Sequence, residues 1–423
     1  MQQREYQRIK EQVWFDTLEN GLAIYVVPKK GFYKSTAVFA TKYGGSDRRF
    51  KLGGKWHDTP AGVAHFLEHK MFDKKDVNVM QQFSALGASP NAFTSSGVTA
   101  YHFECTENFE ENLRILLKFV TEPYFTEESV AKEQGIIAQE IRMIEDNPQF
   151  VVYRNLMQAL YAENPIRDSV AGTVESIARI SAQTLYYCHE AFYTPSNMVL
   201  CAAGDIDPER VREIAEEVLP GEKKETAERD YGKSESPLPL ENRKEVKMEV
   251  GVPIFIAGAK LESRLTGQER QRQELVGDFA INLFLGKSSP LYARLYAEGL
   301  INNTFYGGTS FFPDGAVAVF GGESRDPDAV FSAVAEEAKK FVAEGPERKF
   351  FERLKRAALG EEIRGLNSMY GICTRRIPGH FEGFDPFKSI DILDEITIED
   401  AVSFIADSFK PEKLAISLVR PSK

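Results

Sequence analysis

The sequence predicts an α+β protein made of two related α/β sandwich (roll) domains, and two observations lead to this expectation. First, strands and helices are mixed within each half of the chain. The alternating strands "AIYVVP" (residues 23–28) and "STAVFATKY" (residues 35–43) precede helices, and strands return after them. Second, the two halves carry similar segments in the same order, which indicates an internal repeat.

The internal repeat is clearest near the end of each half. "ISAQTLYYCHEAFYTPSNMVLCAA", from Ile180, aligns without a gap with "ITIEDAVSFIADSFKPEKLAISLV", from Ile396, at an offset of 216 residues. Each stretch has the pattern of an amphipathic helix, then an aromatic residue and a proline, then an apolar strand. Upstream, "QEIRMIED" and "EEIRGLNS" match in the same order. These pairs favour two copies of one structural unit.

A stretch of different composition separates the two copies. In "PGEKKETAERDYGKSESPLPLENRKEVK", residues 220–247, charged residues together with Pro, Ser and Gly replace the apolar periodicity. We therefore predict a first domain over residues 1–219, a linker over residues 220–247 and a second domain over residues 248–423.

Bulk composition narrows the classes of function. The net charge of −11 disfavours a nucleic-acid partner, because that role needs a concentrated basic surface. The four cysteines form no CxxC pair, so we expect buried free thiols rather than disulfides or metal ligands. No run of about eighteen apolar residues could span a bilayer, and the N-terminal "MQQREYQRIKEQVWF" is too charged for a secretory signal. These features predict a cytoplasmic protein with no membrane partner.

The stretch "AGVAHFLEHKMF", residues 61–72, combines an apolar helix with three ionisable side chains. Thr59 is a candidate N-cap for a helix from about Pro60 to Phe72. On this helix His65, Glu68 and His69 form one narrow stripe, and almost every other position is apolar. Buried imidazoles and carboxylates need partners. Each histidine could satisfy a local backbone group, but one metal ion bound by two imidazoles at i and i+4 satisfies both together.

A second predicted helix, "EQGIIAQEIRMIE" (residues 133–145), offers a further ligand. Glu133 and Glu140 are seven residues apart and therefore lie on one side, which also carries Ile137 and Ile144. A carboxylate in an apolar stripe is costly without a cation. A semi-exposed helix edge or a buried salt bridge would also account for this pattern. Together with the histidine helix, a shared metal site explains both segments.

These residues resemble the pitrilysin and insulinase family of zinc peptidases, which includes mitochondrial processing peptidase. His65, Glu68 and His69 form the inverted motif H-x-x-E-H, and Glu133 with Glu140 resembles the family's E-x6-E pair. The stretches "NGLAIYVVP", "LGASPNAFTSSGVTAYHFE" and "FYTPSNMVLCAAGDID" are also similar to the family. The resemblance covers essentially the whole chain. It implies a fold of the metalloprotease LuxS/MPP-like type, packed as one half of a clamshell, with zinc held only in the first domain.

The resemblance also implies a role for individual residues. His65, His69 and Glu140 would bind Zn²⁺. Glu68 would be the general base, and Glu133 would belong to the catalytic site by supporting a ligand histidine. Asn91 and Ala92 would face a peptide substrate that adds as an extra strand to a sheet edge. Asn91 could instead simply end a turn after Pro90.

One departure from the family pattern concerns the second repeat. Active members commonly carry a motif similar to L-R-E-x-x-G-L-A-Y, whose Arg and Tyr bind substrate and stabilise the transition state. In "RLYAEGLINN" the simplest alignment puts Tyr296 where Arg is expected and Asn302 where Tyr is expected. A shifted register would use Arg294 and Tyr306 instead. The chain therefore resembles the zinc-binding member of a two-chain processing peptidase.

The sequence thus predicts a zinc endopeptidase subunit that cleaves peptides or short unfolded segments in a chamber closed by a homologous partner chain. Two alternatives stay open. The chain could be a self-sufficient homodimeric peptidase, or a non-catalytic structural subunit that has the same fold, similar to the core subunits of a respiratory complex. The complete set of His65, Glu68, His69 and Glu140 argues against the last alternative.

Overall fold

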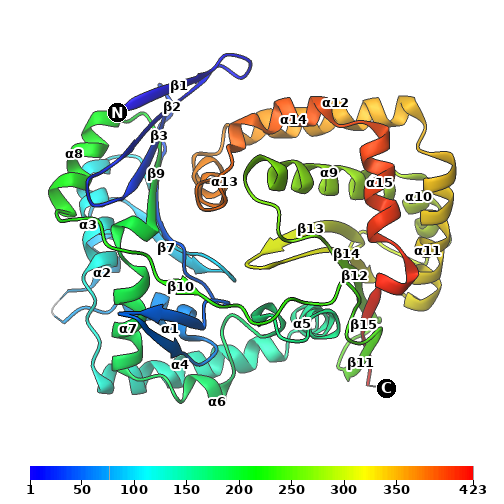
Figure 1. Cartoon of the computed structure of the whole chain (residues 1–423), viewed down its shortest axis with the longest axis horizontal. Helices are drawn as coiled ribbons and strands as arrows, with labels where there is room; N and C mark the ends of the chain where they lie inside the picture. Colours follow the sequence, from blue (N-terminus) through cyan, green and yellow to red (C-terminus); the bar gives the residue numbers. More distant parts are fainter. Residues whose placement is uncertain (76, 423) are drawn as a thin grey trace. The chain divides into compact units, whose positions relative to one another are not determined.

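The computed structural model describes residues 1–75 and 77–422, and its contacts divide the chain into two compact units (Figure 1). Unit 1 consists of three segments, Met1–Ile141, Ser169–Tyr231 and Ile363–Phe387. Unit 2 consists of Arg142–Asp168, Gly232–Glu362 and the segment from Lys388 onward. Each unit therefore contains a segment from the other half of the sequence. The predicted domain boundaries at residues 219 and 248 describe the sequence repeat and stay a prediction.

Unit 1 is built on a seven-stranded sheet of order β1-β2-β3-β9-β4-β8-β7, in which β3 and β9 are parallel and the other neighbours antiparallel. Its other strands form a small sheet of order β10-β5-β6. The bounds are β1 (Gln2–Tyr6), β2 (Glu11–Thr17), β3 (Ala23–Pro28), β4 (Ser35–Thr41), β5 (Arg49–Leu52), β6 (Lys55–Asp58), β7 (Ser89–Thr94), β8 (Thr99–Cys105), β9 (Met198–Gly204) and β10 (Glu228–Arg229). The central strands β4 and β9 are buried along their whole length, as expected for a sheet covered on both faces.

Helices cover both faces of the large sheet of unit 1. One face contacts α1, α3 and α8, and α13 packs on β4 and β9. The α13 face forms an apolar core in which Ile372, Cys373 and Ile377 meet Val38 and Val199. The helices of unit 1 are α1 (Val63–Met71), α2 (Val79–Ala85), α3 (Phe109–Thr121), α6 (Val174–Ile177), α7 (Ala182–Phe192), α8 (Pro208–Val218), α13 (Met369–Glu382) and most of α4 (Glu127–Glu145).

Unit 2 contains a five-stranded sheet of order β11-β15-β12-β14-β13, with β11 and β15 parallel and the other neighbours antiparallel. Helix α5 covers one face, and α9, α11 and α15 belong to the opposite core. The bounds are β11 (Arg243–Met248), β12 (Ile254–Lys260), β13 (Tyr306–Phe312), β14 (Gly315–Glu323), β15 (Ala415–Pro421), α5 (Pro148–Leu160), α9 (Gly267–Leu285), α10 (Pro290–Ala297), α11 (Pro327–Glu344), α14 (Ser389–Glu395), α15 (Ile398–Ser408) and, for most of its length, α12 (Arg348–Gly365).

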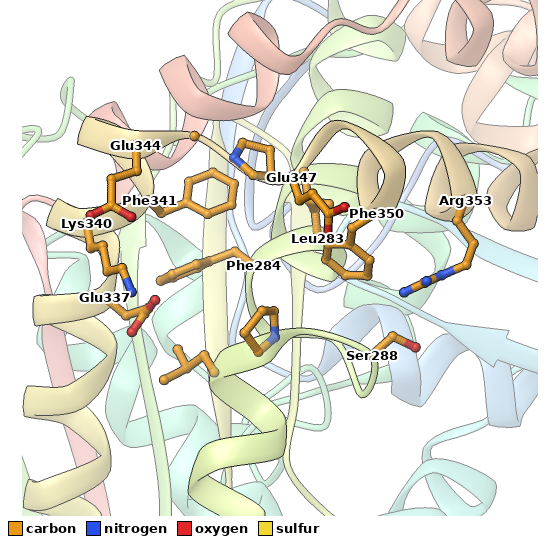
Figure 2. Close-up of a pocket in the computed structure, with 14 residues that line it drawn as sticks. Leu283, Phe284, Ser288, Glu337, Lys340, Phe341, Glu344, Glu347, Phe350 and Arg353 are labelled. Atoms are coloured by element: carbon orange, nitrogen blue, oxygen red, sulfur yellow. The ribbon is translucent and has the colours of Figure 1, made fainter.

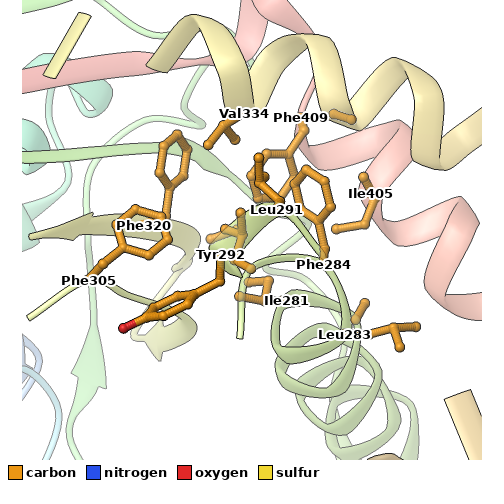
Figure 3. Packing of buried hydrophobic residues seen from close by; sticks show 14 of the residues in the cluster. Ile281, Leu283, Phe284, Leu291, Tyr292, Phe305, Phe320, Val334, Ile405 and Phe409 are labelled. Atoms are coloured by element: carbon orange, nitrogen blue, oxygen red, sulfur yellow. The ribbon is translucent and has the colours of Figure 1, made fainter. Parts of the chain in front are cut away.

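Aromatic rings dominate the larger core of unit 2 (Figure 3). The Phe409 ring lies 5.3 Å from Phe284 and 5.8 Å from Phe320, measured between centroids, so helices α9 and α15 are joined to strand β14 through one side chain. Such contacts remove large apolar areas from water, which is the main favourable term in folding.

The internal repeat is confirmed by the positions of the elements. Helix α7 (Ala182–Phe192) and helix α15 (Ile398–Ser408) begin and end at residues separated by the predicted offset. A short 3-10 turn follows each helix, Pro195–Asn197 in one copy and Pro411–Lys413 in the other, and then a buried strand. Both helices are capped by a hydroxyl side chain. The same local signals therefore produce the same helix, turn and strand twice.

The predicted linker contains ordered structure. Residues Glu228–Arg229 form β10 and pair with β5 in unit 1. In unit 2, the carboxylate of Glu235 accepts hydrogen bonds from the backbone N–H groups of Ala162, Glu163 and Asn164 at 2.7–3.0 Å. The charged composition of this segment predicts a solvated linker. In the structure, however, the segment is held by strand pairing in unit 1 and by the hydrogen bonds of Glu235 in unit 2.

Two predictions from composition can be compared with the structure. All four cysteines are buried and free, as predicted. Among the described residues, no helix combines the length and the apolarity that crossing a membrane would require.

Candidate active site

The histidine helix begins later than the sequence predicts. Helix α1 starts at Val63 rather than near Pro60, and Gly62 occupies the N-cap position with φ +97°. Thr59 does not cap the helix, because its hydroxyl donates to the backbone oxygen of Arg48 at 3.0 Å. A Cβ atom on Gly62 would lie 2.6 Å from the backbone oxygen of Ala171. Glycine therefore permits both the left-handed turn and the close approach at the start of α1.

Helices α1 and α4 bring together the three predicted metal ligands. The imidazole rings of His65 and His69, on adjacent turns of α1, have centroids 4.6 Å apart. Glu140 of α4 lies against both rings: its Oε1 is 3.5 Å from Nε2 of His65, and its Oε2 is 3.7 Å from Nε2 of His69. The ligand atoms of these three residues all lie within 4.8 Å of one another, an arrangement that could hold a metal ion.

The donor atoms fit one divalent cation. Nitrogen and oxygen atoms bound to zinc at about 2.0–2.2 Å in tetrahedral geometry are separated by roughly 3.3–3.5 Å, close to the distances between Glu140 and the two rings. Glu133 lies on the other side of His69, with Oε1 3.1 Å from Nδ1 of that ring. When Nδ1 donates this hydrogen bond, Nε2 keeps its lone pair for a metal. The Nδ1 atom of His65 is buried and lacks a hydrogen-bond partner within residues 1–75 and 77–422.

The electrostatics differ between the two histidines. Burial, and then the nearby His69, lower the pKa of His65 to about 4, so that ring is neutral at pH 7 and its contact with Glu140 is not a salt bridge. Burial also lowers the pKa of His69, but the hydrogen bond to Glu133 and the surrounding carboxylates outweigh it, so the net direction is upward. A neutral imidazole is the form that binds metals.

Glu68 lies beside the metal-ligand cluster without belonging to it. Its side chain is largely buried, and burial raises the pKa of its carboxyl group. Its Oε2 accepts a hydrogen bond from the hydroxyl of Thr94 on β7 at 2.6 Å. The sequence analysis did not single out Thr94. The only signal was its place three residues after Asn91 in a stretch that resembles the family.

Asn91 and Ala92 lie on β7, which is the edge strand of the seven-stranded sheet. Asn91 therefore does not end a turn; it pairs with His102 of β8 within the strand. Its side-chain oxygen accepts a hydrogen bond from the backbone N–H of Ala92 at 2.9 Å. Helix α1 contacts the same strand, so the candidate substrate residues and the metal-ligand cluster belong to neighbouring elements of unit 1.

Comparisons with known proteins agree with this geometry. Residues 53–174 match the family model "Insulinase (Peptidase family M16)", and residues 179–358 match "Peptidase M16 inactive domain". The uncharacterized zinc protease YmfH of Bacillus subtilis is 38% identical over 427 residues, which covers 99% of this chain and 98% of the relative. The chain belongs to the insulinase family of peptidases, family M16.

Solved structures extend the comparison. An M16-like peptidase from Alicyclobacillus acidocaldarius is 31% identical, with a TM-score of 0.93 over 97% of this chain and 99% of that one. A chain of Complex III2 from Candida albicans has a TM-score of 0.77 at 13% identity, covering 96% of this chain and 95% of that one. The first is a family relative, whereas the second shows that the fold alone is shared.

The residues aligned with the motif L-R-E-x-x-G-L-A-Y lie in unit 2. Tyr296, on α10, is exposed and stacks on Tyr292, and the side chain of Asn302 donates to Glu323 at 2.8 Å. In the shifted register, Arg294 pairs with Glu337 at 3.2 Å. Tyr306, at the start of β13, is exposed. The two alignments thus assign different side chains to the Arg and Tyr positions. Arg294 already forms an ion pair with Glu337 within unit 2.

Glu337, the partner of Arg294, also lines a cavity of about 320 Å³ between the ends of α9, α10, α11 and α12 (Figure 2). Aromatic side chains lie in the middle of its lining, and Glu337, Lys340 and Glu344 lie along one side. None of the predicted site residues lines this cavity. This cavity is therefore separate from the cluster of His65, His69 and Glu140.

Proposed function

We propose that this chain is a zinc-dependent endopeptidase subunit that hydrolyses peptides or short unfolded segments. The observation that carries the proposal is the convergence of His65, His69 and Glu140 on one point, with Glu68 beside them and outside the ligand set. Three protein ligands leave a catalytic zinc one open position.

Each side chain has a distinct chemical task in this proposal. Zinc, when bound, supplies a Lewis acid that polarises the scissile carbonyl and acidifies a neighbouring water. Glu68 takes the proton of that water and delivers it to the leaving amine. The raised pKa of Glu68 suits this double role, because a more basic carboxylate accepts a proton more readily and then holds it until the amine departs. Glu133 orients the ring of His69.

The proposed substrate is an extended peptide that adds to the outer edge of β7. An edge strand presents unpaired backbone groups that can bind another strand through main-chain hydrogen bonds. Asn91 and Ala92 lie on that edge strand. Because such recognition uses the backbone, unfolded segments with varied side chains are suitable substrates, whereas folded proteins are not.

We further propose that a homologous partner subunit supplies the Arg and Tyr that stabilise the transition state. Tyr296 and Asn302 stand where these groups are expected, and Arg294 is paired with Glu337. A heterodimer with a chain that carries both groups accounts for these observations. A homodimer stays the alternative, in which Tyr306 would take part from this chain or its copy.

A non-catalytic structural subunit is the second alternative. The fold resemblance to a chain of Complex III2 motivates it, because a shared fold does not imply shared chemistry. The cluster argues against it, since a scaffold gains nothing from placing two histidines and several carboxylates in a partly buried cluster.

The experiment that tests the proposal is the substitution Glu68→Gln in the full-length chain. Glutamine keeps the size of the side chain but cannot accept the proton, so peptide hydrolysis should fall roughly a hundredfold or more while the zinc content stays the same. Undiminished hydrolysis by the variant would remove Glu68 from the base role. Loss of zinc together with activity would make Glu68 a ligand instead.

A further inference from the structure

We propose that Thr94, on the edge strand β7, is a positioning residue for Glu68 of α1. This inference rests on the proposed function for the role of Glu68, but its structural part can be tested independently. Both residues belong to unit 1.

The contact that matters joins β7 to α1. The hydroxyl of Thr94 lies 2.6 Å from Oε2 of Glu68, which is a short hydrogen bond to a carboxylate. The same hydroxyl lies 3.3 Å from the hydroxyl of Thr99 on the neighbouring strand β8. Thr99 in turn lies 2.9 Å from the backbone oxygen of Tyr43.

Counting hydroxyl protons shows which oxygen receives the proton of Thr94. The backbone oxygen of Tyr43 can only accept, so Thr99 donates its one proton there. Thr99 then has no proton left to donate to Thr94. Thr94 has one proton and two neighbours, and the Glu68 carboxylate is both nearer and charged. Thr94 therefore donates to Glu68, and its hydroxyl only contacts that of Thr99 at 3.3 Å.

This arrangement has a consequence for the orientation of Glu68. A glutamate on a helix has three rotatable side-chain bonds, and it adopts one orientation only when its carboxylate is held. The bond from Thr94 holds Oε2 and turns the carboxylate plane, so that Oε1 is the oxygen available to the water. Thr94 cannot rotate away easily, because it is β-branched and lies in a strand.

A merely structural reading is also available for Thr94, since a buried carboxylate needs a hydrogen-bond donor for stability alone. The two readings predict different kinetics. If Thr94 only satisfies a buried group, its removal lowers stability and leaves the turnover of the folded enzyme unchanged. If it positions Glu68, its removal lowers kcat while KM and zinc content change little, because the proposed substrate contacts use the backbone of β7, which the substitution keeps, and zinc is held by other residues.

The experiment compares Thr94→Val with Thr94→Ser in the full-length chain, assayed alone or mixed with a homologous subunit, whichever form is more active. Valine has the shape of threonine without the hydroxyl, so kcat should fall roughly 10- to 100-fold, a part of the whole contribution of a general base. Serine restores the donor and should recover most of the rate. Thr36→Val is the matched control, because Thr36 is a buried threonine of β4 whose hydroxyl donates to the backbone of Phe103 at 2.7 Å; its kcat should stay unchanged.

Crystal structures of the two Thr94 variants and elemental analysis provide readouts other than activity. The Glu68 carboxylate should leave its position in T94V and keep it in T94S, with equal zinc content in both. An unmoved Glu68 in T94V overturns the proposal, and so does an unchanged kcat when E68Q is inactive. If E68Q is fully active, the proposed function of Glu68 fails, and the position of Glu68 in T94V still decides whether Thr94 orients it.

Discussion

The Nδ1 atom of His69 lies 3.1 Å from Oε1 of Glu133, while Nε2 of the same ring lies 3.7 Å from Oε2 of Glu140. One helix, α4, thus contacts both nitrogens of one imidazole with two glutamates placed two turns apart. His65 has no such support, because its Nδ1 lacks a hydrogen-bond partner in the part of the chain that the structure describes. The two ligand histidines therefore depend differently on their surroundings.

Glu133→Gln tests this asymmetry. A glutamine cannot provide the negative charge that fixes the tautomer of His69, so the affinity for zinc should fall about 10- to 100-fold while the fold is kept. Competition with a chromophoric chelator measures the affinity. Glu128→Gln, an exposed position in the first turn of the same helix, is the control and should bind zinc normally. Equal affinities of the two variants would contradict the support role of Glu133.

The ligand set itself predicts one zinc ion per chain. His65→Ala and Glu140→Gln each remove a donor atom from the cluster, so both variants should lose the metal after zinc-replete expression. Elemental analysis of the purified chains measures this. His57→Ala should retain one zinc, because His57 stacks on Phe50 outside the cluster. Full zinc content in both ligand variants would refute the site.

The partner proposal predicts how activity depends on a second chain. Loss of an oxyanion-type stabiliser typically costs about 2.7–4 kcal/mol, so the isolated subunit should be some 100- to 1000-fold less active than the mixture. The partner should be a homologous subunit of similar length that lacks H-x-x-E-H but carries the Arg and Tyr in its second repeat. Substituting either residue in the partner should abolish the gain without affecting zinc here. Strong hydrolysis by this chain alone, unchanged by any added subunit, would favour the homodimer.

The buried His189 predicts a loss of stability in acid. Burial lowers its pKa to about 4, although its Nε2 lies 3.1 Å from the backbone oxygen of Val120. Between about pH 6.5 and pH 4 the unfolded chain binds a proton at this residue that the native state does not, so stability falls as the pH falls through that window. His189→Gln can keep the hydrogen bond but does not titrate.

Urea unfolding at pH 7 and pH 4.5 measures this effect. The decrease in the free energy of unfolding between the two pH values should be smaller in His189→Gln than in the unsubstituted chain by roughly 2–3 kcal/mol. The comparison isolates His189, because the other titrating groups are present in both proteins. The same pH dependence in both proteins would mean that His189 already binds its proton in the native state.

The local features of the site could be predicted from the sequence because they depend on spacing along a helix. The i, i+4 spacing of His65 and His69 places both rings on one face of any helix, whatever surrounds it. The repeat was equally visible, since helix caps and apolar periods act over a few residues, and α7 and α15 have matching bounds. The start of α1 was predicted wrongly, because the hydroxyl of Thr59 bonds to Arg48, a residue distant in sequence.

Only the tertiary structure decided which residues meet across the sheet and between helices. Thr94 reaches Glu68 because β7 lies beside α1. Likewise α13, from the C-terminal half, covers the sheet of unit 1, although its own sequence does not indicate which sheet it packs against. The physical reason is that periodicity determines which face of an element is apolar, whereas the partner of that face is chosen by the packing of the whole chain.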